Sequence, residues 1–296
     1  MTHDKLDDGR HREGRRSFLK KVGLGAAVAW TAPTIASSRA LAQSTCGISG
    51  PNDITNLLAW WDGADPTTIN PPTNPLTDVA LQTWADKSGN GYDLVQNTAA
   101  NQPTWRFNTG INGLGSVEFD GTDDWLETAL TVLNGLTDVT VFYVAANDVS
   151  PDGPVLWGYD SSAGNSTNAW QVAGADVTGS LTGESFTLAS NGNAAGTTNA
   201  DYTLGTDIVT ITQTTTLSTL RVNLTARTLS LGNPALDLTP SAAVGGNADT
   251  LRVGGDDLAA QTVFDGMIGE IIIYDRVLNA TEIDQVECYL NLKWYL

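Results

Sequence analysis

The chain has 296 residues, of which 33 are acidic and 15 are basic, and its formal net charge at pH 7 is −18. Eight of the basic and four of the acidic residues lie in residues 1–42, so residues 43–296 hold 7 basic and 29 acidic residues and a formal charge of −22. A surface this negative argues against binding to nucleic acid or anionic lipid, because both need clustered Lys and Arg, and it attracts cations, calcium above all.

Residues 43–296 contain no histidine, since His3 and His11 both precede them. This excludes Ser-His-Asp and Cys-His catalysis and any imidazole metal site from that part of the chain. Carboxylates are then the strong candidates for a general acid, a general base or a nucleophile. The same residues hold no glycine-rich phosphate loop and no Cys-x-x-Cys set, so we expect no redox or nucleotide cofactor.

Residues 1–42 have the pattern of a twin-arginine export signal. Arg15–Lys20 contains the paired arginines, Val22–Thr34 is a weakly apolar run, and Ala40–Ala42 has the small-x-small form of a signal-peptidase site. The apolar run is shorter than the roughly 20 residues that a membrane helix needs. We expect cleavage after Ala42 and export to the cell surface, the periplasm or the extracellular space, which leaves one domain with no membrane span; a basic surface helix is the alternative.

Cys46 and Cys288 are the two cysteines of the chain. In an oxidising compartment an even pair forms a disulfide more often than two free thiols. A bridge that closes so long a loop stabilises a fold by about 4–5 kcal/mol in the chain-entropy model. The pair predicts that the two ends of the domain are neighbours.

The rest of the domain has the pattern of an antiparallel sandwich or barrel. Short segments rich in β-branched and aromatic residues alternate with clusters of Gly, Asn, Asp, Thr and Pro, and residues 163–168 and 190–200 are expected loops. The expected strands are Leu57–Trp61, Tyr92–Gln96, Ser116–Asp120, Trp125–Thr128, Val139–Ala146, Val155–Tyr159, Ala169–Ala173, Ser185–Ala189, Ile208–Gln213, Leu220–Thr225, Thr228–Leu231, Thr250–Val253 and Gly266–Tyr274.

Two of these strands predict different degrees of burial. Val209 and Ile211 alternate with Thr210 and Thr212, as expected of a half-buried strand. Ile271–Ile273 is a continuous apolar run, which suits a strand covered on both faces.

One helix is expected at the end of the chain, with Asn279 or Thr281 as its cap. Its apolar stripe at helical spacing consists of Ile283, Val286, Leu290 and Trp294. Because this helix directly follows a strand, we expect it to cover an edge or an end of the sandwich.

Several blocks of sequence occur in a characteristic order along the domain. They are Leu58–Asp65, Trp84–Gly91, Val117–Asp124, Leu251–Gly255 and Phe264–Leu278, with a continuation through Glu282, Tyr289, Leu290 and Lys293–Tyr295. Together they resemble laminin-G-like domains of the concanavalin A-like lectin/glucanase superfamily. Residues 160–245 contain no matching block and share only the general character of such sequences. The resemblance implies an all-β jelly-roll sandwich of two antiparallel sheets, with the terminal strands adjacent, to which the expected helix is added.

The segment Glu118–Asp120 invites an enzymatic interpretation. Glucanases of the superfamily carry a Glu-x-Asp-x-x-Glu strand whose two glutamates act as nucleophile and acid, on one face of the sheet. Here Asp123 stands at the position of the second glutamate, and the pair Gly121-Thr122 interrupts the strand before it. We therefore interpret the segment as a strand that ends in an Asp-Gly turn, and we assign no catalytic residue.

Asp120, Asp123 and Asp124 form the densest acidic loop of the domain. Calcium takes six to eight oxygen ligands, and such a loop can supply several of them, so we expect these residues to be the calcium ligands. Ordinary turn chemistry is the alternative. Second-choice calcium loops hold the pairs Asp62 with Asp65 and Asp86 with Asn90.

Aromatic side chains supply the candidate glycan-binding residues, because sugars stack on exposed indole and phenol faces. Trp157 and Tyr159 alternate onto one face of their expected strand, and Trp170 begins a nearby strand. For any single tryptophan, a place in the core is the more common outcome.

The leading hypothesis is an exported, non-catalytic binding or adhesion module for polysaccharide or another cell-envelope component, with calcium as its candidate cofactor. The first alternative is a carbohydrate-active enzyme, either a glycoside hydrolase or a polysaccharide lyase, that uses carboxylates. The second is a structural matrix or surface protein without a small ligand. The fold hosts all three classes, so the fold alone does not choose between them.

Overall fold

The computed structural model describes residues 45–70, 77–128, 132–133, 136–147, 154–159, 170–175, 184–190, 193–196, 205–214, 217–227, 250–255 and 263–296. The chain divides into two units, residues 1–36 and 37–296, and every described residue belongs to the second. Among the described residues, no helix combines the length and the apolar character that crossing a membrane requires.

The described part of the second unit forms two nine-stranded sheets in which neighbouring strands are antiparallel. The first sheet, sheet A, has the order β16-β15-β14-β9-β18-β7-β6-β3, and β1 also pairs with β18. Its strands are β1 (Leu57–Asp62), β3 (Val79–Ala80), β6 (Thr104–Arg106), β7 (Ser116–Asp120), β9 (Val139–Asn147), β14 (Thr206–Gln213), β15 (Ser218–Val222), β16 (Thr225–Arg227) and β18 (Asp265–Tyr274).

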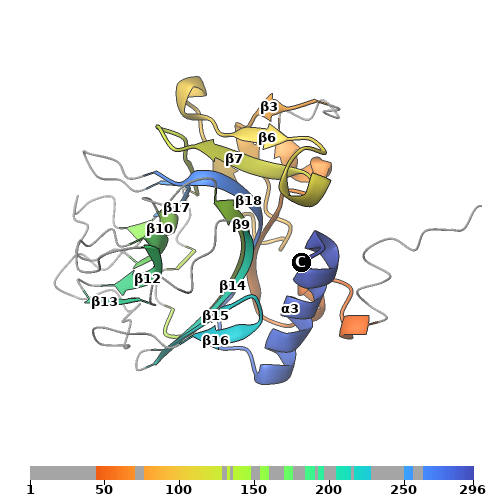
Figure 1. The fold of residues 1–296 in the computed structure, drawn as a ribbon, viewed down its shortest axis with the longest axis vertical. Helices are drawn as coiled ribbons and strands as arrows, with labels where there is room; N and C mark the ends of the chain where they lie inside the picture. Colours follow the sequence, from red (N-terminus) through yellow and green to blue (C-terminus); the bar gives the residue numbers. More distant parts are fainter. Residues whose placement is uncertain are drawn as a thin grey trace, which may run out of the picture. The chain divides into compact units, whose positions relative to one another are not determined.

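The second sheet, sheet B, has the order β13-β12-β11-β10-β17-β8-β5-β4-β2 and faces sheet A (Figure 1). Its strands are β2 (Ile69–Asn70), β4 (Thr83–Trp84), β5 (Leu94–Val95), β8 (Leu126–Thr128), β10 (Pro154–Tyr159), β11 (Trp170–Ala175), β12 (Glu184–Ser190), β13 (Asn193–Gly196) and β17 (Thr250–Val253). The predicted all-β sandwich of two antiparallel sheets with a C-terminal helix is therefore confirmed.

The main core lies between the two sheets. It consists of aliphatic and aromatic side chains that alternate inward along the strands, and Trp61, Trp84, Trp105 and Phe119 are among its largest fully buried members. Burial of an aromatic side chain of this size removes roughly 150–250 Å² of surface from water, which makes these residues a main source of stability.

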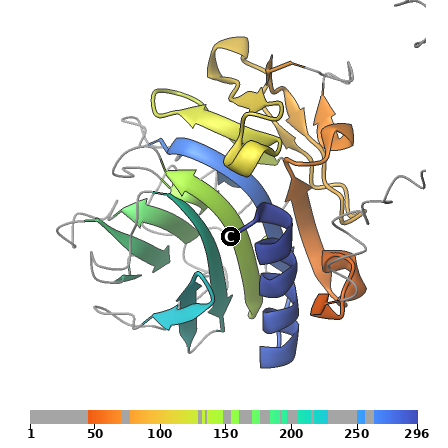
Figure 2. The same ribbon diagram turned by 45° about the vertical axis from the view of Figure 1, so that its right-hand side comes forward.

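Helix α3 (Ala280–Trp294) packs on the outer face of sheet A, as Figures 1 and 2 both show. Asn279 caps the helix as predicted, because its side chain accepts a hydrogen bond from the Glu282 N–H at 3.1 Å and the Glu282 carboxylate accepts one from the Asn279 N–H at 2.9 Å. The expected position at an edge or end of the sandwich is wrong. The reason is a second apolar row on the outer face of sheet A: Phe142, Val144, Ile208, Ile272 and Tyr274.

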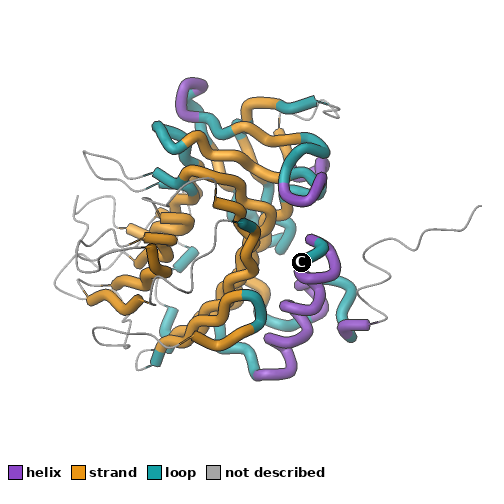
Figure 3. The backbone as a smooth tube through the Cα atoms, in the orientation of Figure 1, coloured by secondary structure: helices purple, strands orange, loops and turns teal. Residues whose placement is uncertain are grey.

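Coverage of sheet A on both faces decides the burial of its strands. Ile271–Ile273 is buried on both sides, as predicted. The prediction of a half-buried β14 is wrong, because α3 packs against this strand. Figure 3 shows the helix alongside the strands. In β14, Thr210 is 1% exposed and donates a hydrogen bond of 2.7 Å to Glu287 of the helix.

Cys46 and Cys288 form the predicted disulfide, with 5.5 Å between their Cα atoms. The bridge joins the start of the described chain to α3 across a sequence separation of 242 residues. Both cysteines of the chain are therefore bridged, and the ends of the domain are neighbours as predicted.

The structure also contains short strands that the sequence pattern does not predict, namely β2, β3, β4, β6 and β13. Strand β13 lies within an expected loop, 190–200. The expected strand Leu220–Thr225 is interrupted at Asn223 and Leu224, which adopt positive φ angles of 48° and 66° and turn the chain into β16. The strand expected over residues 228–231 falls outside the described residues.

Candidate functional site

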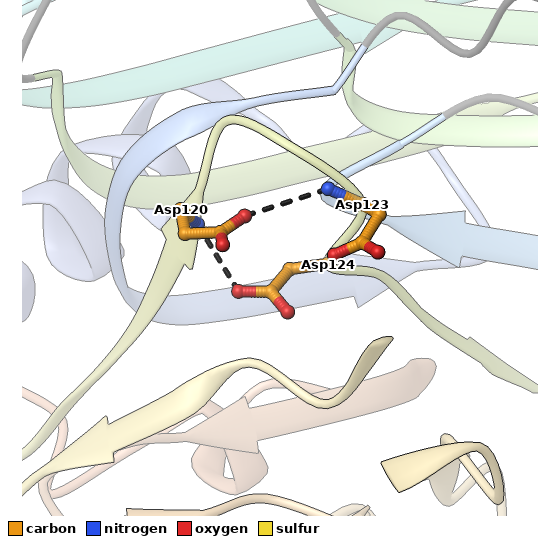
Figure 4. Close-up of side chains that lie close together, drawn as sticks. All are labelled: Asp120, Asp123 and Asp124. Atoms are coloured by element: carbon orange, nitrogen blue, oxygen red, sulfur yellow. Dashed lines mark hydrogen bonds between the residues drawn. The ribbon is translucent and has the colours of Figure 1, made fainter. Parts of the chain in front are cut away.

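Asp120, Asp123 and Asp124, which we call the acidic loop, lie in the connection from β7 of sheet A to β8 of sheet B. One carboxylate oxygen from each residue lies within 4.8 Å of the other two, and Figure 4 shows the three side chains converging on one another. Gly121 follows Asp120 with a φ of +68°, which a glycine adopts at no steric cost. The Asp-Gly turn thus brings the carboxyl group of Asp120 close to those of Asp123 and Asp124, which follow it by three and four residues.

Backbone amides of the turn orient two of these carboxylates. The Asp120 N–H donates to Asp124 Oδ2 at 3.1 Å, and the Asp123 N–H donates to Asp120 Oδ1 at 3.4 Å (Figure 4). The Thr122 N–H also donates to Asp120 Oδ1, at 2.8 Å. These are the bonds of an Asx turn, so the local sequence accounts for the geometry without a bound ion.

The three carboxyl groups differ in their contact with water. Asp120 is exposed, Asp123 is half-buried, and Asp124 is 6% exposed. Burial, together with the negative charges of Asp120 and Asp123, raises the pKa of Asp124 to about 6. The loop therefore holds one carboxyl that is protonated in a substantial fraction of molecules near pH 6.

A neighbouring segment holds the acidic loop in place. Asn101 donates from its side-chain amide to the Asp123 carbonyl oxygen at 2.9 Å, and its own carbonyl oxygen accepts from the Trp125 N–H at 3.3 Å. Gln96, which is 2% exposed, donates to the Trp125 carbonyl oxygen at 3.2 Å. The loop is fixed by side chains about 25 residues earlier in the chain.

A fourth carboxylate, Asp265, lies beside the acidic loop. The strand register places it directly opposite Asp120, and a Cβ added to Gly121 would lie 2.8 Å from its Cγ. Like charges at directly opposed positions of an antiparallel pair are destabilising. Sequence reasoning missed Asp265, because only the β7–β18 register brings it to residues 145 positions away.

Trp125 and Arg252 form a stacked pair next to the loop. The Arg252 guanidinium carbon lies 3.9 Å from the centre of the indole ring, and Arg252 Nε donates to Glu127 at 3.1 Å. The indole is half-buried, whereas Arg252 is 7% exposed. The sequence pattern places Trp125 in a strand and gives no signal of this contact.

The predicted glycan-binding aromatics are placed by their backbones alone, because the side chains of Trp157, Tyr159 and Trp170 fall outside the described residues. Trp157 and Tyr159 occupy alternate positions of β10, as predicted. Trp170 pairs with Gly158, the position between them. A role of these three residues in ligand binding stays a prediction.

The second-choice calcium loops are occupied by other partners. The Lys87 ammonium lies 2.8 Å from carboxylate oxygens of both Asp62 and Asp65, so a protein cation already takes the position between them. The Asp86 carboxylate accepts hydrogen bonds from the Trp60 N–H at 2.9 Å and from the Tyr92 N–H at 3.1 Å. Calcium binding at these two loops stays a prediction, and in the structure their acidic groups hold neighbouring loops against β1.

A buried charge cluster lies between sheet A and α3. Glu270 is fully buried and accepts hydrogen bonds from Trp60 Nε1 at 2.7 Å and Trp294 Nε1 at 2.9 Å. Lys293 contacts both Glu270, at 2.7 Å, and Asp62, at 2.6 Å. Burial raises the pKa of Glu270, and Lys293 acts against that rise. The cluster lies beneath the helix, so we interpret it as structural.

A groove of about 570 Å³ lies between β14–β16 and the start of α3. Arg221, Arg227, Leu220, Val277 and Ile283 contribute to its lining, together with several hydroxyl side chains. Arg221 is held by the Glu287 carboxylate at 2.8 Å. The groove is built from elements that do not include the acidic loop.

Comparison with known proteins shows that solved structures of other proteins share the fold of this chain. A scan against protein-family models and a search of curated proteins found no match. Among solved structures, domain 4 of AbnA, a GH43 extracellular arabinanase from Geobacillus stearothermophilus in complex with arabinotriose, is similar with a TM-score of 0.53 and 11% identity, over 79% of this chain and 98% of that one.

Two further solved structures are similar at the same level. Trypanosoma rangeli sialidase in complex with sialic acid has a TM-score of 0.53 and 13% identity, over 81% of this chain. A GH54 α-L-arabinofuranosidase soaked with a cyclic sulfate inhibitor has a TM-score of 0.52 and 11% identity, over 79% of this chain. This chain spans 33% of the sialidase and 63% of the arabinofuranosidase.

This comparison corrects the leading prediction of a non-catalytic binding or adhesion module. The three solved structures named above come from glycoside hydrolases, and this finding runs against that prediction. The physical reason is that binding modules and hydrolases share this fold, and the interrupted Glu-x-Asp-x-x-Glu spacing along the chain does not show which carboxylates come together in space.

Proposed function

We propose that the domain is a carbohydrate-active enzyme that hydrolyses glycosidic bonds, with the acidic loop as its catalytic carboxylates. The observation that carries the proposal is the contrast within the loop: a buried Asp124 whose pKa is raised to about 6, beside the more exposed Asp120 and Asp123. Neighbouring carboxyl groups in environments that differ this way suit the roles of general acid and nucleophile.

In the proposed reaction Asp124 acts as the general acid and donates its proton to the leaving oxygen of the glycosidic bond. Asp123 stands where the resemblance to glucanases places a catalytic glutamate, and it acts as the second carboxylate.

Three further observations support the proposal. The structural neighbours named above are glycoside hydrolases, and the sequence blocks resemble laminin-G-like domains of a superfamily that includes glucanases. The twin-arginine pattern, with cleavage after Ala42, supports export. The Cys46–Cys288 bridge suits an oxidising compartment outside the cytoplasm. Polysaccharides and cell-envelope glycans are the substrates available there.

The test is a cleavage assay on the exported form, residues 43–296, against a panel of polysaccharides that includes arabinan. We expect new reducing ends from at least one substrate, and we expect Asp124→Asn to lower kcat by at least about 100-fold. Asp284→Asn is the matched control, because its carboxylate is 68% exposed on α3, and it should retain full activity. Equal rates for the native protein and Asp124→Asn would contradict the proposal.

A calcium ion is the second candidate for the same loop, favoured by the convergence of its three carboxylates. Calorimetric titration with calcium separates the two roles. Binding that Asp123→Asn abolishes, together with unimpaired glycan cleavage in chelator, would make the loop a metal site and move catalysis elsewhere.

A further inference from the structure

Trp125, the residue after Asp124, is held on both sides of its backbone. Its N–H donates to Asn101 and its carbonyl oxygen accepts from the buried side chain of Gln96. An aromatic ring on a fixed backbone loses little conformational freedom when a ligand binds to it, which favours affinity. This distinguishes Trp125 from an aromatic residue on a loose surface loop.

The orientation of the indole follows from what lies beneath it. Arg252 occupies one face of the ring at 3.9 Å and is itself 7% exposed, so that face is covered and the solvent contact of the half-buried indole lies elsewhere on the ring. Glu127 holds the guanidinium from the side at 3.1 Å. The stack of sheet, guanidinium and indole therefore presents a rigid apolar surface at the border of the acidic loop, of the kind on which a sugar ring stacks.

The negative charge around Trp125 favours uncharged sugars over acidic ones. Trp125 adjoins the acidic loop, and Asp265 adds a carboxylate on the neighbouring strand. A sugar that carries a carboxylate or a sulfate would enter a field of its own sign. The cation at this position, Arg252, is already paired with Glu127.

From this geometry we propose that Trp125 is the sugar-stacking residue of the site and that its ligand is an uncharged glycan. This rests on the proposed function, because it deepens the description of the same site by naming a substrate class and a residue that contacts it. Glycans built from neutral pentoses or hexoses fit the surface, and uronic-acid or sialic-acid glycans do not.

The test measures binding without turnover, in the Asp124→Asn background. Calorimetry follows the neutral trisaccharides of arabinose, xylose, glucose, galactose and mannose, and the trisaccharide of galacturonic acid. We expect at least one neutral trisaccharide to bind, and we expect Trp125→Ala to weaken it by about tenfold. Trp125→Phe, which keeps an aromatic face, should stay within about threefold. The acidic trisaccharide should bind at least about tenfold more weakly than the best neutral one.

Tyr295→Ala is the control for removal of an exposed aromatic, since Tyr295 is 72% exposed at the end of α3, and it should leave binding unchanged. Unfolding midpoints show whether each variant is folded, and the Phe variant keeps the test decisive if the Ala variant unfolds. Unchanged binding in folded Trp125→Ala, a preference for galacturonic acid, or binding of no neutral trisaccharide would overturn the proposal. If Asp124→Asn still cleaves the bound trisaccharide, the catalytic assignment fails, while loss of binding in Trp125→Ala still supports the stacking role.

Discussion

Lys293 of α3 donates a hydrogen bond of 2.7 Å to the fully buried carboxylate of Glu270 in β18. The same ammonium reaches Asp62 of β1 at 2.6 Å, so one side chain of the helix neutralises two carboxylates of the sheet that it covers. Buried carboxylates without a partner are costly, and this makes the helix and sheet A interdependent.

Removal of that ammonium should therefore be among the most destabilising changes on α3. We expect Lys293→Met to lower the free energy of unfolding by about 3–5 kcal/mol, because it leaves buried charge uncompensated. Lys87→Met, at a side chain that is 22% exposed, should cost about 1 kcal/mol or less. Urea unfolding measures both, and Glu270→Gln added to Lys293→Met should recover part of the loss. A Lys293→Met protein within 1 kcal/mol of the native one would contradict this account.

Asp124 predicts a pH dependence of stability. Its folded-state pKa of about 6 lies above the usual 3.8, so its contribution to stability is fully present below pH 3.8 and is lost as the pH rises through 6. Asp124→Asn removes this charge and keeps an oxygen that can accept from the Asp120 N–H. We expect the variant to exceed the native protein by about 1–2 kcal/mol at pH 8 and to match it at pH 3.5. Urea midpoints at the two pH values check this, and a variant that is less stable at pH 8 would refute it.

The disulfide predicts a large loss of stability on reduction. Cys46→Ser combined with Cys288→Ser should lower the free energy of unfolding by about 2–5 kcal/mol, because the unfolded chain regains the freedom of a loop of more than 200 residues. Thermal unfolding of the native protein with and without a reducing agent gives an independent measurement. The double variant should not respond to the reducing agent, and a response would show that the effect has another source.

Gly254 and Gly91 allow a matched test of close packing. Both have positive φ angles, +86° and +82°, but a Cβ on Gly254 would collide with the Phe119 ring, whereas a Cβ on Gly91 meets nothing within 4 Å. Gly91→Ala should cost about 1 kcal/mol for its backbone conformation alone, and Gly254→Ala should cost at least about 2 kcal/mol more. Denaturant unfolding of the pair isolates the steric part. Equal costs would mean that the Phe119 ring can move aside.

Local sequence signals predicted the parts of the fold that depend on neighbours in the chain. The capping box of Asn279 and Glu282 and the apolar run Ile271–Ile273 are read directly from adjacent residues. The position of α3 was predicted wrongly, because it depends on an outer apolar row contributed by β9, β14 and β18 together. Two-residue strands such as β4 are too short to show an alternating pattern, and pairing alone defines them.

The candidate site was likewise predictable only where it depends on residues that are close together in the sequence. Three aspartates within five residues identified the acidic loop, but no local pattern indicates Asp265, which reaches Gly121 through the β7–β18 register. Nor does any pattern indicate that Arg252 lies beneath Trp125, since Trp125 directly precedes β8 and Arg252 lies in β17, 127 positions later. The raised pKa of Asp124 depends on burial, which a list of residue types does not contain.

The Cys46–Cys288 bridge also determines how the domain bears mechanical load. A pull on the chain from before Cys46 and from after Cys288 passes through a covalent bond and bypasses the strand ladders that lie between the two residues. The sheets then stay unloaded under tension that would shear a sandwich held by hydrogen bonds alone. In the reduced state the same pull would reach β1 and the β18–α3 junction first, so the redox state of one bond sets whether the fold yields to force.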